Sequence, residues 1–245
     1  MIDEFILVSL VIFVFSIIQS VFGMGILVFG TPTLLLVGYD FFTTICTLLP
    51  SSMAISFLQV VPNMKRGAYI SRSLYIFCVP SIAAGLWLVD TEITSDLTHI
   101  MIGSMLLLTA LARLWDRPRQ WLLATLERNE NLYHLGMGLI HGLTNLGGAF
   151  LAILVARYSK DKIKMQYTTA HYYLIFSAIQ ISFLLFVIGR HNDLVGALPF
   201  AAMAALVHLI LGNVAFARIP NKAYQAMFTV FIAAYGAAVL MKSNT

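Results

Sequence analysis

Residues 5–39 read FILVSLVIFVFSIIQSVFGMGILVFGTPTLLLVGY, and none of these thirty-five positions is Asp, Glu, Lys or Arg. A membrane-spanning helix needs about 20 apolar residues to cross roughly 30 Å of hydrocarbon. One straight helix over the whole stretch would be about 52 Å long at 1.5 Å per residue, which exceeds a single crossing. Gly23, Gly25 and the run Gly30-Thr31-Pro32 weaken helix locally. The stretch therefore predicts a membrane segment that is a hairpin or a broken helix.

Apolar tracts of this kind recur along the chain. Of its 245 residues, 60% are hydrophobic and only 11% are charged, whereas an ordinary soluble domain has roughly 25% charged residues. A soluble core does not need such a pattern many times over, so the sequence predicts a helical membrane protein of several spans. The charged residues separate eight uncharged tracts, at residues 5–39, 41–64, 73–89, 97–112, 131–156, 165–189, 194–217 and 223–241.

The first tract is not expected to be a signal peptide. It is preceded by Asp3 and Glu4 rather than by a basic region, and no small-residue cleavage site follows it. Cys46 and Cys78 both lie inside apolar tracts, where reduced, packed cysteines are expected. The net charge of +4 comes from basic residues that edge the tracts, so we interpret them as topology determinants rather than as contacts to nucleic acid.

The basic residues indicate which loops share a side of the membrane, because cytoplasmic loops are rich in Lys and Arg. If all eight tracts cross once, nine basic residues fall on one side and six on the other. If the tract 131–156 enters and returns on one side, breaking near residues 145–148, the division becomes thirteen against two. This arrangement also places Asp40, Asp90, Glu92, Asp96 and Asp193 on the basic-poor side, joined by Asp3 and Glu4 if the first tract also returns. We therefore prefer a returning path for this tract, and for the first tract as well.

The two halves of the chain share a layout, a broken first tract followed by three intact spans. Three crossings are an odd number, so the second half would lie inverted relative to the first, as in many secondary transporters. The expected fold class is an all-α polytopic membrane protein with two inverted four-segment repeats, each opening with a broken helix or re-entrant hairpin. The expected domains are a first membrane repeat at residues 1–114, a cytoplasmic linker at 115–131 and a second membrane repeat at 132–245.

Two glycine-containing motifs open the halves, SVFGMGILVFGTP at residues 20–32 and GLTNLGGAF at residues 142–150, and the small polar run TLLPSS follows at residues 47–52. In these motifs, in length and in its two four-tract halves, the chain resembles the TauE/SafE family of sulfite and organosulfur anion exporters. The resemblance covers essentially the whole chain. It implies a membrane transporter rather than an enzyme, with no cofactor.

An anion carrier has to compensate the charge of its substrate inside the membrane, yet no tract contains a Lys or Arg. The remaining device is the helix terminus, whose N–H groups and dipole attract anions. The breaks at residues 23–25 and 147–148 would supply two such termini, and we expect the anion to bind at these paired breaks near the membrane midplane. The expected substrate-binding residues are Gln19, Gly23, Gly25, Thr31, Thr47, Ser51, Ser52, His141, Asn145, Gly147, Gly148, Thr169 and His171.

His141, His171 and His208 lie inside apolar tracts, and no carboxylate does. Histidine is therefore the ordinary titrating candidate if transport is coupled to protons. His141 and His171, beside the second motif, are the proton-coupling candidates, with a neutral histidine hydrogen-bonded between helices as the alternative for both. For His208 we favour that neutral, hydrogen-bonded role. The same histidines leave an alternative function, an intramembrane enzyme or redox protein. The chain has no Gly-x-Ser-x-Gly or His-Glu-x-x-His motif for it, and we assign no catalytic or metal-binding residue.

The leading hypothesis is a secondary transporter of a small anion: sulfite, a sulfonate, another organosulfur anion or a carboxylate. Its expected partners are that anion, the lipid bilayer and the proton as a candidate coupling ion, without nucleic acid. The expected location is a bacterial inner membrane, which the chain crosses several times. A receptor or assembly protein without transport is a third interpretation, although it would not need two helix breaks. The oligomeric state is left open, with a homodimer among the alternatives.

Overall fold

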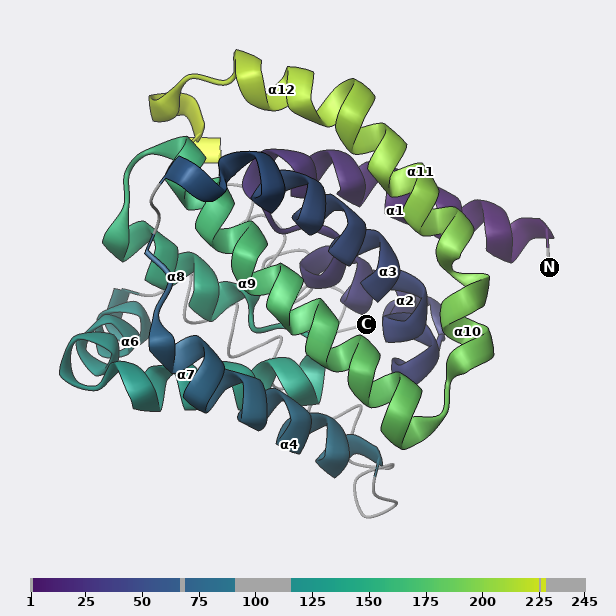
Figure 1. Ribbon diagram of the computed structural model, residues 1–245, viewed down its shortest axis with the longest axis horizontal. Coiled ribbons are helices and arrows are strands. Elements are labelled where there is room, and N and C mark those ends of the chain that lie inside the picture. The colour runs from purple at the N-terminus through teal and green to yellow at the C-terminus, as the bar shows by residue number, and fades with distance from the viewer. Residues whose placement is uncertain (1, 67–68, 91–115, 225, 228–245) are drawn as a thin grey trace. The chain divides into compact units, whose positions relative to one another are not determined.

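The computed structural model describes residues 2–66, 69–90, 116–224 and 226–227, and every regular element in these ranges is a helix (Figure 1). The predicted span 97–112, most of the predicted span 223–241 and Trp115 of the predicted linker lie outside the described residues. The helices form two compact units. The first combines Met1–Tyr69 with Asp161–Pro220, and the second combines Ile70–Lys160 with Asn221–Thr245. The boundaries proposed from sequence at residues 114 and 131 stay predictions.

The first unit takes long helices from both halves of the sequence. Four of its helical stretches are long and apolar enough to cross a membrane: Glu4–Phe22, Phe41–Met64, Lys162–Ile188 and His191–Arg218. The prediction of an all-helical protein with several spans is confirmed at this level. The elements of the unit are α1 (Ile2–Phe22), the π-helical turn η1 (Ile26–Gly30), α2 (Thr31–Val37), α3 (Phe41–Val60), the 3-10 turn η2 (Val61–Arg66), α9 (Lys162–Phe183), the π-helical turn η5 (Leu184–Ile188), α10 (His191–Gly196), α11 (Leu198–Val207), the π-helical turn η6 (His208–Gly212) and α12 (Asn213–Arg218).

The first tract doubles back instead of running straight. After α1 ends, three non-helical residues lead into η1 and α2. Near the start of the tract, the ring of Phe5 lies 5.2 Å from the ring of Phe200. Beyond its far end, the carboxylate of Asp40 is near enough to the guanidinium of Arg190 for that charge to favour its ionised form. Phe200 and Arg190 flank the short helix α10, so both ends of the tract lie at one end of the unit. The predicted break at residues 23–25 is present, and the chain turns around there.

Asp40 begins α3 as its cap. The carboxylate accepts a hydrogen bond from the Thr43 N–H at 3.0 Å, which satisfies a donor that the first helical turn leaves free. Burial opposes ionisation of this carboxyl, but the hydrogen bonds from Thr43 and the charge of Arg190 outweigh burial and hold the pKa of Asp40 below its ordinary value. Arg190 also pairs with Asp193 at 3.0 Å. One end of the unit thus gathers Asp40 and Asp193, two of the carboxylates that the charge pattern assigned to the basic-poor side.

Lys162 marks the opposite end of the first unit, because α9 and η5 run from it toward Arg190. Its ammonium donates to the carbonyls of Phe216 at 2.9 Å and Ile219 at 2.5 Å, and it lies 4.6 Å from the centroid of the Phe216 ring. These carbonyls close α12, and a cation at a helix C-terminus is favourable. Lys162 and the end of α12 therefore lie together at this end of the unit.

The second unit contains closely packed helices with glycine at their contact. The elements among its described residues are the π-helical turn η3 (Leu74–Cys78), α4 (Val79–Asp90), α6 (Asp116–Arg128), α7 (Glu130–Thr144) and α8 (Gly148–Tyr158). A Cβ added to Gly138 would collide with the carbonyl of Cys78, and one added to Gly142 would collide with the carbonyl of Ile82. Small residues let membrane helices approach to this distance, so glycine sets the spacing of α4 and α7.

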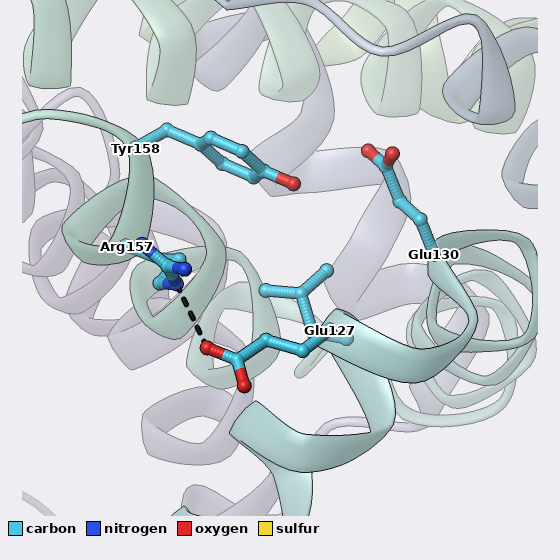
Figure 2. Close-up of a pocket in the computed structure, with 5 residues that line it drawn as sticks. Glu127, Glu130, Arg157 and Tyr158 are labelled. Atoms are coloured by element: carbon cyan, nitrogen blue, oxygen red, sulfur yellow. Dashed lines mark hydrogen bonds and ion pairs between the residues drawn. The ribbon is translucent and has the colours of Figure 1, made fainter.

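The tract 131–156 also doubles back. Helix α7 ends at Thr144 and α8 begins at Gly148, within the predicted break. The last turn of α8 returns to the region where α7 starts, because Arg157 pairs with Glu127 at 3.1 Å. Figure 2 shows this ion pair beside a surface pocket of about 500 Å³, with Tyr158 directed toward Glu130. The two ends of the tract thus lie together within the unit.

The glycine contact predicts a position-dependent effect of adding one methyl group to α7. Gly142→Ala should lower the thermal unfolding temperature, since overpacking costs roughly 1–3 kcal/mol. Gly136→Ala is the matched control, because a Cβ on Gly136 meets nothing within 4 Å and alanine is the better helix former by about 1 kcal/mol. Thermal unfolding of both variants in detergent checks this, and equal unfolding temperatures would contradict it.

Candidate functional site

The first helix break is shaped by a close approach of α9 to the chain. Gly23 has a φ of +76°, in the left-handed region that glycine adopts at little cost. A Cβ on Gly23 would lie 2.7 Å from the carbonyl oxygen of Gln166 and 3.0 Å from the Cβ of Thr169. A Cβ on Gly25 would lie 2.6 Å from the main-chain nitrogen of Gln19. The chain beyond the break therefore folds directly back onto α1, and only glycine fits at these two positions.

Gln19 ties three segments together at the break. Its Nε2 donates to the Ser52 carbonyl at 2.9 Å and also lies 3.1 Å from the Ser52 hydroxyl and 3.2 Å from the Ser56 hydroxyl. Its Oε1 accepts the Ile26 N–H at 3.1 Å. Ile26 begins η1, and the first N–H groups of a helix have no partner inside that helix. Gln19 thus joins α1, α3 and η1, and it takes up one of the N–H groups that the break leaves open.

Two further glutamines satisfy the carbonyl groups at the end of α1. Gln59 of α3 donates through Nε2 to the carbonyls of Gln19 and Ser20, both at 3.0 Å. Gln166 of α9 donates through Nε2 to the carbonyl of Ser20 at 2.7 Å and lies 3.4 Å from that of Val21. The last carbonyls of a helix lack intrahelical partners, so α3 and α9 together close the end of α1. Figure 1 shows these two helices side by side.

Ser20 also connects the end of α1 to η6. Its hydroxyl lies 2.7 Å from the carbonyl of Ser16, to which it donates, and 2.9 Å from Nδ1 of His208. His208 is 3% exposed. A Cβ on Gly212 would collide with the Ser20 side chain, so glycine on the next turn makes this contact fit. His208, interpreted from sequence as a histidine hydrogen-bonded between helices, is thus bonded to the last turn of α1.

Some buried hydroxyls of the first unit have no hydrogen-bond partner among the described residues. The hydroxyls of Thr47 and Thr169 behave differently, since each donates to the carbonyl four residues earlier at 2.8 Å. Ser51 directly precedes Ser52, which is bonded to Gln19. An unsatisfied buried hydroxyl costs roughly 1–3 kcal/mol, so an acceptor that reaches one of these groups is favoured. The unpartnered hydroxyls are those of Ser16, Thr44, Ser51 and Ser177.

The second break, in the second unit, is held by a histidine. Asn145 follows α7 with φ +60° and ψ +14°, a left-handed conformation in which Asn is enriched. The hydroxyl of Thr144 accepts the Leu146 N–H at 3.2 Å. Nδ1 of His141 accepts the Gly147 N–H at 3.3 Å, and a Cβ on Gly147 would lie 2.7 Å from the Cβ of His141. This break leads directly into the N-terminus of α8.

The thirteen residues predicted to bind substrate divide between the two units. Those in the first unit are Gln19, Gly23, Gly25, Thr31, Thr47, Ser51, Ser52, Thr169 and His171, and those in the second are His141, Asn145, Gly147 and Gly148. The structure brings Gln19, Ser52 and Gly25 into contact, and Gly23 against Thr169. Thr47 is half-buried, and its hydroxyl donates to the carbonyl of Thr43 in the same helix. A single site formed by both breaks stays a prediction.

The sequence-based set of binding residues left out Gln59, Gln166, Ser20 and His208, which surround the first break. The sequence signal for this role was the presence of two glutamines inside membrane tracts, because a polar side chain in a membrane helix needs hydrogen-bond partners. Spacing alone did not show that both would reach the same carbonyl, since Gln166 lies 146 residues beyond Ser20.

The helices and the buried polar network define a membrane protein of the transporter class, whose interior polar groups are arranged around broken helices. The model of the family described as Sulfite exporter TauE/SafE matches residues 8–239. The chain therefore belongs to the sulfite exporter TauE/SafE family, whose members are membrane transporters and not enzymes. The resemblance inferred from the two glycine motifs is confirmed. Comparison with curated proteins and with solved structures gives no match.

The family also establishes the general partners of the chain. A transporter of this family acts on an anionic substrate in a lipid bilayer, as the sequence predicted. Within the described residues, no group of three or more His, Cys, Asp or Glu side chains is placed to hold a metal ion. The family assignment replaces the alternative of an intramembrane enzyme.

The close approach at Gly23 predicts that a single methyl group disturbs the break. Gly23→Ala should lower the unfolding temperature more than Gly38→Ala. Both positions have a positive φ and share a conformational cost of roughly 1–2 kcal/mol, but only Gly23 also faces the main chain of α9, whereas a Cβ on Gly38 meets nothing within 4 Å. Thermal unfolding of the two variants compares them directly. Equal losses would show that α9 does not constrain the break.

Proposed function

We propose that the chain transports a small oxyanion, with sulfite, sulfonates, other organosulfur anions and short carboxylates as the candidate class. The anion binds at the first helix break, between the N–H groups that open the helix Ile26–Val37 and the hydroxyls of α3. The family match supports transport of an anion. The geometry of the break supports the place of binding, because η1 begins there beside the buried Ser52 of α3, and the first N–H groups of a helix have no partner inside that helix.

Helix N–H groups suit this task in a site without cations. The tracts that form the unit contain no Lys or Arg, and the basic side chain Lys162 is already bonded at the end of the unit. The positive end of a helix dipole compensates part of an anion's charge. Dipoles and hydroxyls hold an anion less tightly than an ion pair would, so the site can also release it.

The single observation that carries this proposal is the hydroxyl of Ser51. It is fully buried and lacks a hydrogen-bond partner among the described residues. The next residue, Ser52, accepts a hydrogen bond from Gln19 at the break. A buried hydroxyl without a partner is costly in an empty protein. It becomes favourable when an acceptor such as an anionic oxygen occupies the site.

The second break supplies an equivalent N-terminus at α8, preceded by Gly147. Each half opens with a helix that breaks at glycine and doubles back, which supports the inverted-repeat architecture and a shared role for the two breaks. We further propose a bacterial inner membrane as the location, with the charge-rich linker at residues 115–131 on the cytoplasmic side. The homodimer stays a prediction.

Thermal unfolding of the purified protein with a panel of anions tests the proposed substrate class. Sulfite, sulfate, thiosulfate, methanesulfonate and short carboxylates are compared at matched ionic strength. A ligand at about 100 times its dissociation constant stabilises the folded state by about 2.7 kcal/mol, so a substrate should raise the unfolding temperature selectively. A panel without any shift would contradict binding by this protein.

Ser51→Ala separates binding from folding. Because the wild-type hydroxyl is unsatisfied, its removal should leave the unfolding temperature unchanged or higher without anion. Affinity for the anion should fall roughly ten- to a hundredfold, since a hydrogen bond to a charged group contributes about 1.5–3 kcal/mol. Ser182→Ala is the control, because Ser182 is exposed and bonds the carbonyl of Ala178. Unchanged affinity in Ser51→Ala would remove Ser51 from the site.

A further inference from the structure

We propose that His208 is a protonation site linked to anion binding at the first helix break, an inference that rests on the proposed carrier function. The position of this side chain carries the argument. It is buried in η6, and its Nδ1 lies 2.9 Å from the hydroxyl of Ser20. The carbonyl of the same Ser20 accepts from Gln59 and Gln166. One residue therefore links the histidine to the main chain that leads into the break.

The hydrogen bonds around Ser20 fix where a proton can bind. The Ser20 hydroxyl has one hydrogen, which it donates to the carbonyl of Ser16 at 2.7 Å. It can then only accept from His208, so Nδ1 carries the hydrogen of the neutral ring. The lone pair is left on Nε2, for which the described residues offer no partner. A proton can bind Nε2 without breaking the bond to Ser20 or moving the ring.

Burial opposes a charge on His208, and the end of α1 offsets part of that cost. The ring lies beside the last turn of α1, where the negative end of a helix dipole stabilises a cation. The elements packed against η6 are α1, α11 and α12. Their charged residues are Asp3 and Glu4 at the start of α1 and Arg218 at the end of α12. Glu4 lies about 24 Å along its helix from Ser20, and Arg218 about 15 Å from His208, at 1.5 Å per residue.

His141 shows the opposite arrangement at the second break. Its Nδ1 accepts the N–H of Gly147, so the neutral ring carries its hydrogen on Nε2. A proton could then bind only at Nδ1, where it would face the N–H of Gly147 and break that contact. His208 can take up a proton with its hydrogen bond intact, which distinguishes it from the histidine of the second motif.

Protonation of His208 places a positive charge beside Ser20, in the turn of α1 that leads into the break where the anion is proposed to bind. Anion binding should then raise the proton occupancy of His208, and a proton on His208 should raise the affinity for the anion by the same factor. A coupling of this kind lets a proton gradient act on anion movement. The charge of the imidazolium also supplies the cation that the membrane tracts otherwise lack.

The protonation site can be tested without any substrate. In protein labelled with 15N-histidine, the resonances that disappear in His208→Asn belong to His208. Their shifts should show a hydrogen on Nδ1 and a titration at Nε2 between about pH 4 and pH 9. Asn keeps an amide donor for Ser20 in place of Nδ1–H but cannot titrate. A His208 signal that does not change over this range overturns the proposal.

The coupling is measured with methanesulfonate, which stays ionised over this pH range, so that any pH dependence belongs to the protein. Wild-type affinity, from the shift in unfolding temperature, should rise about fivefold or more as pH falls through the titration. His208→Asn should abolish this rise while still binding the anion, and His191→Asn, at an exposed histidine of α10, should retain it.

A pH dependence that persists in His208→Asn, or a variant that no longer binds, overturns the coupling. A wild type that binds no anion contradicts the carrier function, and the titration of His208 then tests the protonation site by itself.

Discussion

The structure depends on satisfying main-chain groups where α1 ends inside an apolar tract. Hydrocarbon offers no hydrogen bonds, so a broken helix in a membrane has to find internal partners for its carbonyl and N–H groups. Gln19, Gln59 and Gln166 provide them from three helices. These amides fix the distances between α1, α3 and α9. The glycines at the break let the main chain lie close to α1 and α9, within hydrogen-bond distance of the amides. The candidate site and the contact with His208 both follow from this closure.

The large features of the fold could be predicted from the sequence because they depend on local composition. Uncharged tracts gave the helical spans, and glycines 23 and 25 gave the position of the first break. The uneven distribution of basic residues indicated that tract 131–156 returns, in agreement with the pairing of Arg157 and Glu127. Each of these inferences uses neighbouring residues or a sum over loops, so no tertiary contact had to be known.

The polar network could not be predicted in the same way. Gln19 was singled out as a substrate ligand, but its amide is bonded to Ser52 and Ile26, so in this structure it braces the break. His208 was interpreted as a neutral histidine hydrogen-bonded between helices, but the sequence did not name its partner. Its partner, Ser20, lies 188 residues away, and the π-helical turn that begins at His208 is not evident from composition. Long-range pairing and irregular turns decided these roles, and π-helical turns often occur at functional positions.

The hydrogen bonds that close the end of α1 form at different times during synthesis, because their donors lie far apart in the sequence. Gln59 follows Ser20 by 39 residues and Gln166 follows it by 146. At a synthesis rate of about 5–20 residues per second, the first amide is made about 2–8 s after Ser20 and the second about 7–30 s after it. During the interval, the carbonyls at the end of α1 have the hydrogen bonds from Gln59 of α3 but not those from Gln166 of α9. Helix α9 therefore completes the closure of α1, and a chain that stops before it lacks the hydrogen bonds from Gln166 to the carbonyls of Ser20 and Val21.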